Sequence, residues 1–315
     1  QLHEINGDKG NSKFLPHLMG HEGCGIVQEI GPGVSNVQPG DKVVMHWRPG
    51  QGIDSEFPKY SLNGNQFTSG KVNTLCELSI GIEEGYTKEE LYRSLNDFKP
   101  NVVFHIGACS DTLNTDVNYV LETNYIKTKW IADWCYVNNI KLIYASSAAI
   151  YGTDKNLPSN LYGWSKLLGE DYVINKGGIA LRYFNVYGPG EEHKGKMASM
   201  IYQNIKKDKV KLFPNKPTRD FVFIDDVVSA NMYALLNYDK LKGRWYEVGS
   251  GDSSTFEMIF DLLGIEYEYL DKSEIPNGYQ MNTLSLTKNW MPGWKPKVNL
   301  EMGIKRYKKY LDEKS

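Results

Sequence analysis

Apolar strands and amphipathic helices alternate along the chain after Thr87, and this alternation constrains the fold more than any other feature of the sequence. The strand-like runs cover 102–106, 141–145 and 179–184. The helical patterns cover about 87–97, 117–137 and 161–173, with a last amphipathic helix near 300–311. Buried strands that alternate with helices form parallel sheets through βα crossovers. The sequence therefore predicts an α/β fold built on a parallel sheet.

Residues 1 to about 80 have a different composition, with short β-type runs between turn signals. The runs cover 25–27 and 41–45, and the turn signals include Gly31-Pro32-Gly33, Pro39-Gly40-Asp41 and Asn63-Gly64. We therefore predict two parts: a β-rich segment over 1–80 and an α/β domain over 81–315.

Charge and cysteine content exclude several classes of protein. The chain carries 36 basic and 38 acidic residues, so its formal net charge of −2 gives no reason to expect binding to nucleic acid or membranes. No apolar stretch is long enough for a transmembrane helix, and we see no secretion signal. The cysteines show no C-x-x-C spacing and are interpreted as reduced thiols; they are Cys24, Cys76, Cys109 and Cys135. We expect a cytoplasmic protein.

Tyr162 and Lys166 stand one helical turn apart and form the first candidate catalytic pair. A lysine ammonium beside a phenol stabilises the phenolate and lowers the pKa of the tyrosine. The same spacing occurs elsewhere in the chain, where two exposed helix residues explain it. Tyr162, however, follows Ser147 by fifteen residues, and Ser147 ends a predicted strand, where open α/β sheets bind ligands. We interpret all three as catalytic, with a turn or capping role as the alternative for Ser147.

Residues from about 95 to 315 resemble the extended short-chain dehydrogenase/reductases, which include nucleotide-sugar epimerases and dehydratases. The motifs that carry the resemblance are Phe104-His105-x-Gly107-Ala108-Cys109-Ser110, Tyr144-Ala145-Ser146-Ser147-Ala148-Ala149, Tyr162-Gly163-x-Ser165-Lys166, Arg182-Tyr183-Phe184-Asn185-Val186-Tyr187-Gly188-Pro189, His193-Lys194-Gly195-x-Met197-Ala198-Ser199 and Arg219-Asp220-Phe221-Val222. The stretch from His193 to Ser199 is the most specific. It is similar to the ADP-glyceromanno-heptose 6-epimerase family.

This resemblance implies NAD- or NADP-dependent epimerisation of a nucleotide-activated sugar, as an isomerase. Such an enzyme removes hydride from a secondary alcohol, holds the ketone and returns hydride to the opposite face. Each face needs its own proton acceptor and donor. In the family, a tyrosine matching Tyr162 serves one face and a lysine matching Lys194 serves the other, while Lys166 holds the nicotinamide ribose. An exposed loop lysine is the alternative interpretation of Lys194.

The resemblance also assigns binding residues. Besides Lys166, the cofactor contacts would come from Ile106, Gly107, Ala108, Cys109, Ser110, Asn124 and Val186. The substrate contacts would come from Asn185, Gln203, Phe213, Arg219 and Tyr279. Arg219 suits a pyrophosphate because a guanidinium can pair with it bidentately. Lys196 replaces the small residue usual in the family, which leaves another nucleotide-sugar epimerase or dehydratase as an alternative.

The implied fold is a Rossmann-like sheet with a small C-terminal substrate-binding subdomain, in a homo-oligomer. The family opens on a glycine-rich turn whose backbone amides hold the dinucleotide pyrophosphate. We find no such turn here, so we expect the sheet to lack its first βαβ unit. The chain would then bind the dinucleotide weakly. A fused or truncated chain with little activity is the alternative function.

Residues 1–80 resemble part of the catalytic domain of zinc-type medium-chain alcohol dehydrogenases. The stretches Met19-Gly20-His21-Glu22-Gly23 and Pro39-Gly40-Asp41-Lys42-Val43 carry this resemblance. In that family the His and Glu lie at the catalytic zinc, which two cysteines complete. Neither cysteine position is present, and two ligands are too few for zinc. We therefore expect no metal site.

Overall fold

The structure is a computed structural model that describes residues 22–26, 42–46, 60–62, 65–67, 87–153, 157–275 and 279–314. The chain divides into two units, Gln1–Gly81 and Ile82–Ser315.

The first unit contains two antiparallel strand pairs. Strand β1 (Glu22–Ile26) pairs with β2 (Lys42–His46), and β3 (Tyr60–Leu62) pairs with β4 (Asn65–Phe67). Asn-Gly separates β3 from β4 in the sequence, which is a strong hairpin signal. These strands agree with the predicted β-rich segment. The other predicted turns, His21 and Cys76 lie outside the described residues, and only the backbone is described at Glu22 and Cys24.

The second unit is built on a four-stranded parallel sheet with the strand order β11-β7-β6-β5. Its strands are β5 (Val102–His105), β6 (Lys141–Ser147), β7 (Ile179–Tyr183) and β11 (Arg244–Val248). The surrounding helices are α3 (Lys88–Phe98), α4 (Val117–Leu121), α5 (Lys127–Val137), α6 (Leu161–Asn175), α8 (Ile224–Leu236) and α9 (Tyr238–Leu241). The predicted α/β fold with a parallel sheet is confirmed.

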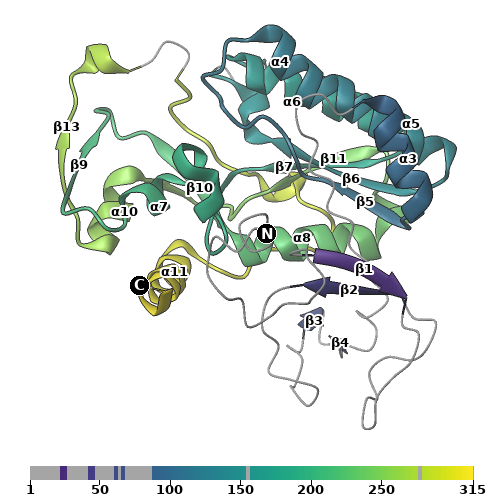
Figure 1. The fold of residues 1–315 in the computed structure, drawn as a ribbon. Helices are drawn as coiled ribbons and strands as arrows, with labels where there is room; N and C mark the ends of the chain where they lie inside the picture. The colour runs from purple at the N-terminus through teal and green to yellow at the C-terminus, as the bar shows by residue number, and fades with distance from the viewer. Residues whose placement is uncertain are drawn as a thin grey trace, which may run out of the picture. The chain divides into compact units, whose positions relative to one another are not determined.

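Helices cover both faces of this sheet. Figure 1 shows α4, α5 and α6 on one face and α8 on the other, and the contacts of α6 and α8 with β6 and β7 agree. Both faces are therefore shielded from water, which is why apolar residues of these strands such as Ile143, Ile179 and Leu181 are fully buried.

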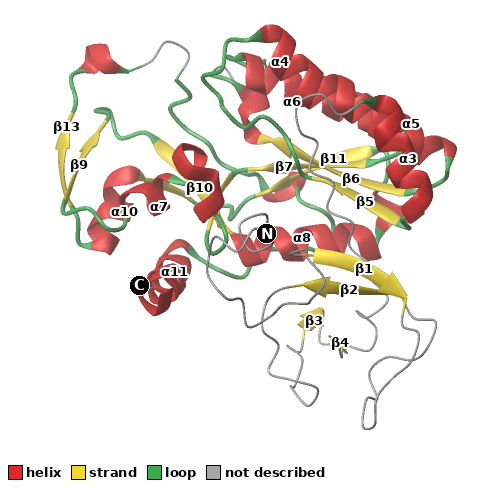
Figure 2. Cartoon of the chain, viewed as in Figure 1, coloured by secondary structure: helices red, strands yellow, loops and turns green. Residues whose placement is uncertain are grey.

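A smaller layer of strands and helices follows the sheet (Figure 2). It contains β8 (Asn185–Tyr187), α7 (Met200–Asn204), β9 (Lys209–Leu212), β10 (Thr218–Phe223), β12 (Ser253–Thr255), α10 (Phe256–Leu263), β13 (Glu266–Tyr269) and α11 (Leu300–Lys314). Strand β10 pairs in parallel with β8 and antiparallel with β12, and β13 pairs in parallel with β9. Tyr187, Ile201, Phe260 and Tyr307 belong to its separate hydrophobic core.

Local sequence signals explain where the helices begin. Thr87 and Glu90 form the expected capping box of α3: the Thr87 side chain accepts from the Glu90 backbone and Glu90 accepts in return. Asn160 caps α6 by accepting from the backbone N–H of Gly163 at 2.8 Å. This cap places Tyr162 in the first turn of α6.

The predicted amphipathic segment 117–137 is interrupted by a π-helical turn, Glu122–Ile126, between α4 and α5. Val120, Ile131 and Trp134 are buried as expected. The expectation of a buried face fails at Val117 and Val137, which are 53% and 79% exposed because they are the first residue of α4 and the last residue of α5.

β5 forms one edge of the described parallel sheet, because none of the described strands pairs with its second side. The first βαβ unit of the family fold, which we expect this chain to lack, is not among the strands and helices described over 87–153, 157–275 and 279–314.

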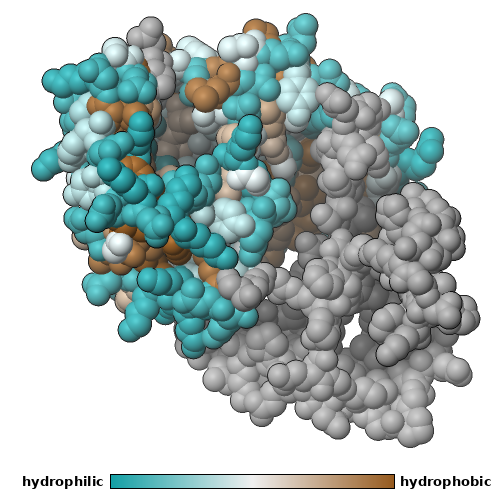
Figure 3. Space-filling view, turned by 60° about the vertical axis from the view of Figure 1, so that its left-hand side comes forward, coloured by the Kyte–Doolittle hydropathy of each residue, from teal (hydrophilic) through white to brown (hydrophobic). Residues whose placement is uncertain are grey.

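Figure 3 shows one face of the second unit. Hydrophilic residues cover much of that face, and hydrophobic residues form small patches between them. Scattered exposed apolar side chains of this kind are normal on soluble domains. No helix in the described part of the chain is both long enough and apolar enough to cross a bilayer.

Two substitutions in α5 test the assigned core. Ile131→Ala should lower the free energy of unfolding by about 2–5 kcal/mol, because Ile131 is 4% exposed and the truncation leaves a cavity. Val137→Ala on the same helix should change it by less than about 0.5 kcal/mol. Urea denaturation of both variants measures this, and equal losses would contradict the assigned burial.

Candidate active site

The carboxyl ends of the parallel strands bring the candidate residues to one edge of the sheet. The register pairs His105, the last residue of β5, with Tyr144, and Ser147, the last residue of β6, with Tyr183. The loop after β5, Ser147 and the residues after β7 therefore share this edge. It is the edge at which open α/β sheets bind their ligands.

Tyr162 and Ser147 come together there. The Ser147 side chain is close enough to the Tyr162 hydroxyl to lower its pKa, and Ser147 Oγ accepts from the backbone N–H of Ala149 at 3.1 Å. Burial raises the pKa of Tyr162, and the Ser147 side chain opposes this rise. The pKa of Tyr162 is therefore raised rather than lowered in this structure, because burial outweighs the interaction with Ser147 and the nearby Cys109 also raises this pKa.

Lys166, one turn after Tyr162 in α6, is buried as well. Its side chain is 2% exposed, and its Nζ lies 4.4 Å from the centroid of the Tyr144 ring. Burial lowers the pKa of Lys166 to about 7, although Glu170, one turn further along α6, favours the charged form.

His105, a buried neutral histidine, lies near Lys166. His105 Nε2 is 2.8 Å from Thr128 Oγ1, whose hydroxyl donates to the Asn124 carbonyl at 2.7 Å. Thr128 must therefore accept from His105, so the hydrogen bonds assign the ring proton to Nε2. Burial, reinforced by the nearby Lys166, lowers the pKa of His105 to about 3.

A buried ionic network continues from Glu170. Its carboxylate pairs with Arg182 at 2.5 Å and accepts from Ser146 Oγ at 2.6 Å. Arg182 Nη1 donates to the Tyr151 hydroxyl at 2.8 Å, and that hydroxyl donates to Glu247 Oε1 at 2.5 Å. The sequence analysis missed this network. Its only local signal is the i, i+4 spacing of Lys166 and Glu170.

The loop after β5 is shaped by Asn124, which the sequence analysis assigned to the cofactor. Asn124 lies in the π-helical turn and is 1% exposed. Its Oδ1 accepts from the Cys109 backbone N–H at 2.7 Å. Its Nδ2 donates to the Cys109 carbonyl at 3.0 Å and to Ser165 Oγ at 2.9 Å. The side chain therefore fixes the loop to α6.

The same loop leaves room for a ligand. A Cβ added to Gly107 would meet no atom within 4 Å. Ile106 is 50% exposed, Ala108 and Cys109 are partly exposed, and Ser110 is exposed. Val186, in β8, is also partly exposed. The predicted cofactor residues Ile106–Ser110 and Val186 are thus at least partly exposed to solvent.

Three predicted substrate residues form a second cluster. Phe213 and Tyr279 meet edge to face with ring centroids 5.0 Å apart, and the Arg219 guanidinium lies 5.0 Å from the Tyr279 ring. Arg219 is 8% exposed, and Nη1 donates to the carbonyls of Thr218 and Met281. Burial lowers the pKa of Arg219. A buried cation next to aromatic rings suits an anionic, ring-bearing ligand.

One contact joins the two clusters. Gln280, next to Tyr279, directs Nε2 to the carbonyl of Ala148, next to Ser147, at 3.5 Å. The sequence analysis did not single out Gln280. No signal in the sequence connects residues so far apart.

The remaining predicted residues lie around β8. Asn185 is exposed at the start of β8, and Lys194 is exposed in the 3₁₀ turn Glu192–Met197. Gln203 donates to the carbonyls of Lys196 at 3.0 Å and Ala198 at 2.7 Å, so it holds the turn of Lys194. No hydrogen bond or ion pair among the described residues joins Asn185, Gln203 or Lys194 to Tyr162. Among the described side chains, no group of three or more His, Cys, Asp and Glu residues could hold a metal ion.

Two families match the chain. The NAD dependent epimerase/dehydratase family matches residues 64–249. The alcohol dehydrogenase GroES-like domain matches residues 2–92. Both resemblances inferred from the sequence are confirmed.

Individual relatives agree. An ADP-L-glycero-D-manno-heptose-6-epimerase of Brachyspira hyodysenteriae is 35% identical over 262 residues, which cover 73% of this chain and 82% of that protein. An enzyme of the same name from Cupriavidus pinatubonensis is 40% identical over 182 residues, 50% of this chain and 54% of that protein. This chain therefore spans about half the length of the second relative.

The crystal structure of the Helicobacter pylori ADP-L-glycero-D-manno-heptose-6-epimerase is also similar. It superposes with a TM-score of 0.61 and 30% identity, over 70% of this chain and 75% of that chain.

The buried neutral His105 predicts a pH dependence of stability. Its folded pKa of about 3 lies below the usual 6.5, so the unfolded chain binds a proton first as the pH falls. The contribution of the neutral His105 to the free energy of unfolding is therefore complete above pH 6.5. It is lost as the pH falls from 6.5 to 3. His105→Gln keeps a donor for Thr128 but cannot titrate. Between pH 7 and 5 the wild type should lose about 2 kcal/mol more than the variant.

Urea denaturation at several pH values measures this difference. Parallel pH profiles for the wild type and His105→Gln would show that His105 is not buried in its neutral form.

Proposed function

Because the chain belongs to the NAD-dependent epimerase/dehydratase family, we propose that it epimerises a nucleotide-activated sugar, ADP-glycero-manno-heptose, at C6. The enzymes named for this reaction in Brachyspira hyodysenteriae and Helicobacter pylori support the choice of sugar. The observation that carries the proposal is the placement of Ser147 at the carboxyl end of β6, with Tyr162 close to it in the first turn of α6 and Lys166 one turn further on. Another nucleotide-sugar epimerase or dehydratase activity is the alternative.

The cofactor is NAD or NADP, which when bound accepts hydride from the sugar and returns it. The residues of the loop 106–110 and Val186 border the space for it, and Asn124 shapes that loop through its bonds to Cys109. Lys166 holds the nicotinamide ribose. Hydroxyls of the ribose would give the buried ammonium hydrogen-bond acceptors, which stabilise its charged form and raise its pKa from about 7.

Proton transfer on one face belongs to Tyr162. Its phenolate accepts the proton of the sugar hydroxyl while Ser147 keeps the hydroxyl in hydrogen-bond range. When Lys166 becomes charged, its field opposes the effect of burial on Tyr162 and favours the phenolate. Lys194 serves the opposite face, where the ketone must be protonated to give the other epimer.

The nucleotide half of the substrate binds to the second cluster, Phe213, Arg219 and Tyr279. Arg219 pairs with the pyrophosphate, and Phe213 and Tyr279 contact the base or the sugar ring. Asn185 and Gln203 complete the substrate side. The bond between Gln280 and Ala148 supports this division, because it places the nucleotide cluster beside the catalytic strand end.

We further propose a division of the chain into a β-rich segment over 1–80 and the epimerase domain over 81–315. The unit boundary after Gly81 supports it. We also propose that the protein works in the cytoplasm, which suits the free thiols of Cys109 and Cys135, and that it forms a homo-oligomer.

Tyr162→Phe should lower turnover about 10²–10⁴-fold and leave binding of the nucleotide sugar nearly intact, because only proton transfer is lost. Tyr172→Phe is a matched control: it lies in the same helix, precedes Lys176 with the same spacing, and bonds Asp133 instead. Steady-state kinetics and calorimetric binding measure both effects. More than about half of the parental rate in Tyr162→Phe would disprove the assigned role.

Lys194→Met should affect proton transfer on one face of the sugar and not on the other. Reduced-nicotinamide absorbance after mixing with each epimer alone reports the first hydride transfer. The epimer oxidised on the Tyr162 face should react at the parental rate, whereas the other epimer and net epimerisation should lose most of their rate. Equal losses for both epimers would assign Lys194 a structural or binding role instead.

A further inference from the structure

One buried carboxylate holds both ends of the turn that carries Lys194. Glu191, 5% exposed, stands immediately before this turn. Its Oε2 accepts from the Ser199 backbone N–H at 2.5 Å and its Oε1 accepts from Ser199 Oγ at 2.7 Å. Because Ser199 follows the turn and caps α7, the Glu191 side chain closes the loop 191–199.

The C-terminal helix supplies the next contact. Tyr307 of α11 is fully buried, and its hydroxyl donates to Glu191 Oε1 at 2.9 Å. Its ring stacks on Tyr202 of α7, with centroids 6.5 Å apart. Burial, and then the negative charge of Glu191, raises the pKa of Tyr307, so the hydroxyl remains a donor across the physiological pH range.

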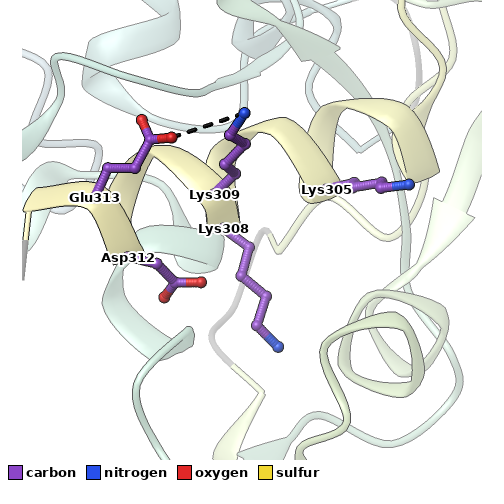
Figure 4. Close-up of a pocket in the computed structure, with 5 residues that line it drawn as sticks. All are labelled: Lys305, Lys308, Lys309, Asp312 and Glu313. Carbon is purple, nitrogen blue, oxygen red and sulfur yellow. Dashed lines mark ion pairs between the residues drawn. The ribbon is translucent and has the colours of Figure 1, made fainter.

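The two sides of α11 differ in character. On the buried side, Tyr310 adds a second bond to the turn by donating to Glu192 Oε1 at 3.1 Å. Figure 4 shows the other side, where exposed charged residues include an ion pair of 3.7 Å between Lys309 and Glu313. The helix thus contacts the turn with its tyrosines and leaves its charges in water.

The backbone of Lys194 is fixed while its side chain is exposed. Its N–H donates to the Glu191 carbonyl at 3.0 Å. The next residue, Gly195, has a φ of 53°, a conformation that suits glycine. Gln203 holds the following carbonyls of Lys196 and Ala198. The position of the Lys194 Cα therefore depends on Glu191 and its partners.

We propose that Glu191 and Tyr307 are positioning residues for Lys194, so that the C-terminal helix sets the geometry of proton transfer on the second face of the sugar. The inference rests on the proposed function, in which Lys194 serves that face. Proton transfer needs heavy atoms within about 2.6–3.2 Å. A displacement of about 1 Å can therefore cost about 100-fold in rate.

Tyr307→Phe tests the assignment, because it removes one donor and keeps the ring. The first hydride transfer is measured from each epimer separately by reduced-nicotinamide absorbance. The epimer oxidised on the Lys194 side should react about 10- to 100-fold more slowly, and the epimer oxidised on the Tyr162 side should be unchanged. Tyr246→Phe is the matched control: Tyr246 is 7% exposed and makes one bond, to the Leu241 carbonyl, away from the turn. It should leave both rates unchanged.

Equal losses for both epimers, or no loss for either, would overturn the assignment. If Tyr307→Phe does not fold, as judged by circular dichroism, Glu191→Gln decides instead, because it weakens the bonds to Ser199 and Tyr307 and keeps the side-chain length: a loss confined to the Lys194 side supports the assignment, and any other result overturns it.

Lys194→Met, measured in the same assay, separates this inference from the proposed function. A one-sided loss in Lys194→Met without one in Tyr307→Phe rejects only the positioning role. No one-sided loss in Lys194→Met rejects the role of Lys194 on the second face, and the positioning role with it.

Discussion

The parallel register of β5, β6 and β7 is the constraint on which the rest of the structure depends. Because all three strands run in one direction, His105, Ser147 and Tyr183 end at the same edge. The cap of α6 at Asn160 then places Tyr162 against Ser147. A slip of one residue between β6 and β7 would turn Ser147 to the other face of the sheet. The position of Ser147 thus depends on strand pairing, and that of Tyr162 on the cap of α6.

Burial of charge is the second constraint. Lys166, Glu170 and Arg182 lie in the interior, where an isolated ion is costly and each must find partners. The Glu170 carboxylate forms an ion pair with Arg182 and accepts a hydrogen bond from Ser146, and Glu170 lies one helical turn from Lys166. Burial outweighs the charge of Glu170 and lowers the pKa of Lys166 to about 7. A small change in its surroundings, such as new hydrogen-bond acceptors, is enough to change its charge.

Local patterns in the sequence predicted the elements, because the capping box at Thr87 and the alternation of strands and helices were sufficient for that. The spacing of Ser147, Tyr162 and Lys166 singled out candidate residues, whose catalytic roles stay predictions. The direction of the Tyr162 pKa was wrong, because it depends on how deeply tertiary packing buries the phenol. The bond of Gln280 to Ala148 and that of Tyr307 to Glu191 join residues more than a hundred positions apart, and no periodicity encodes such contacts.

The π-helical turn at Glu122–Ile126 makes this region sensitive to chain length. Such a turn contains one residue more than the α-helical turn it replaces. Each residue of an α-helix rotates the chain by about 100°, so deleting one residue here would turn Asn124 away from either Cys109 or Ser165. Single-residue deletions are usually tolerated in surface loops. In this helix a deletion would detach the loop 106–110 from α6, which makes the length of the segment, as well as its side chains, a condition for the site.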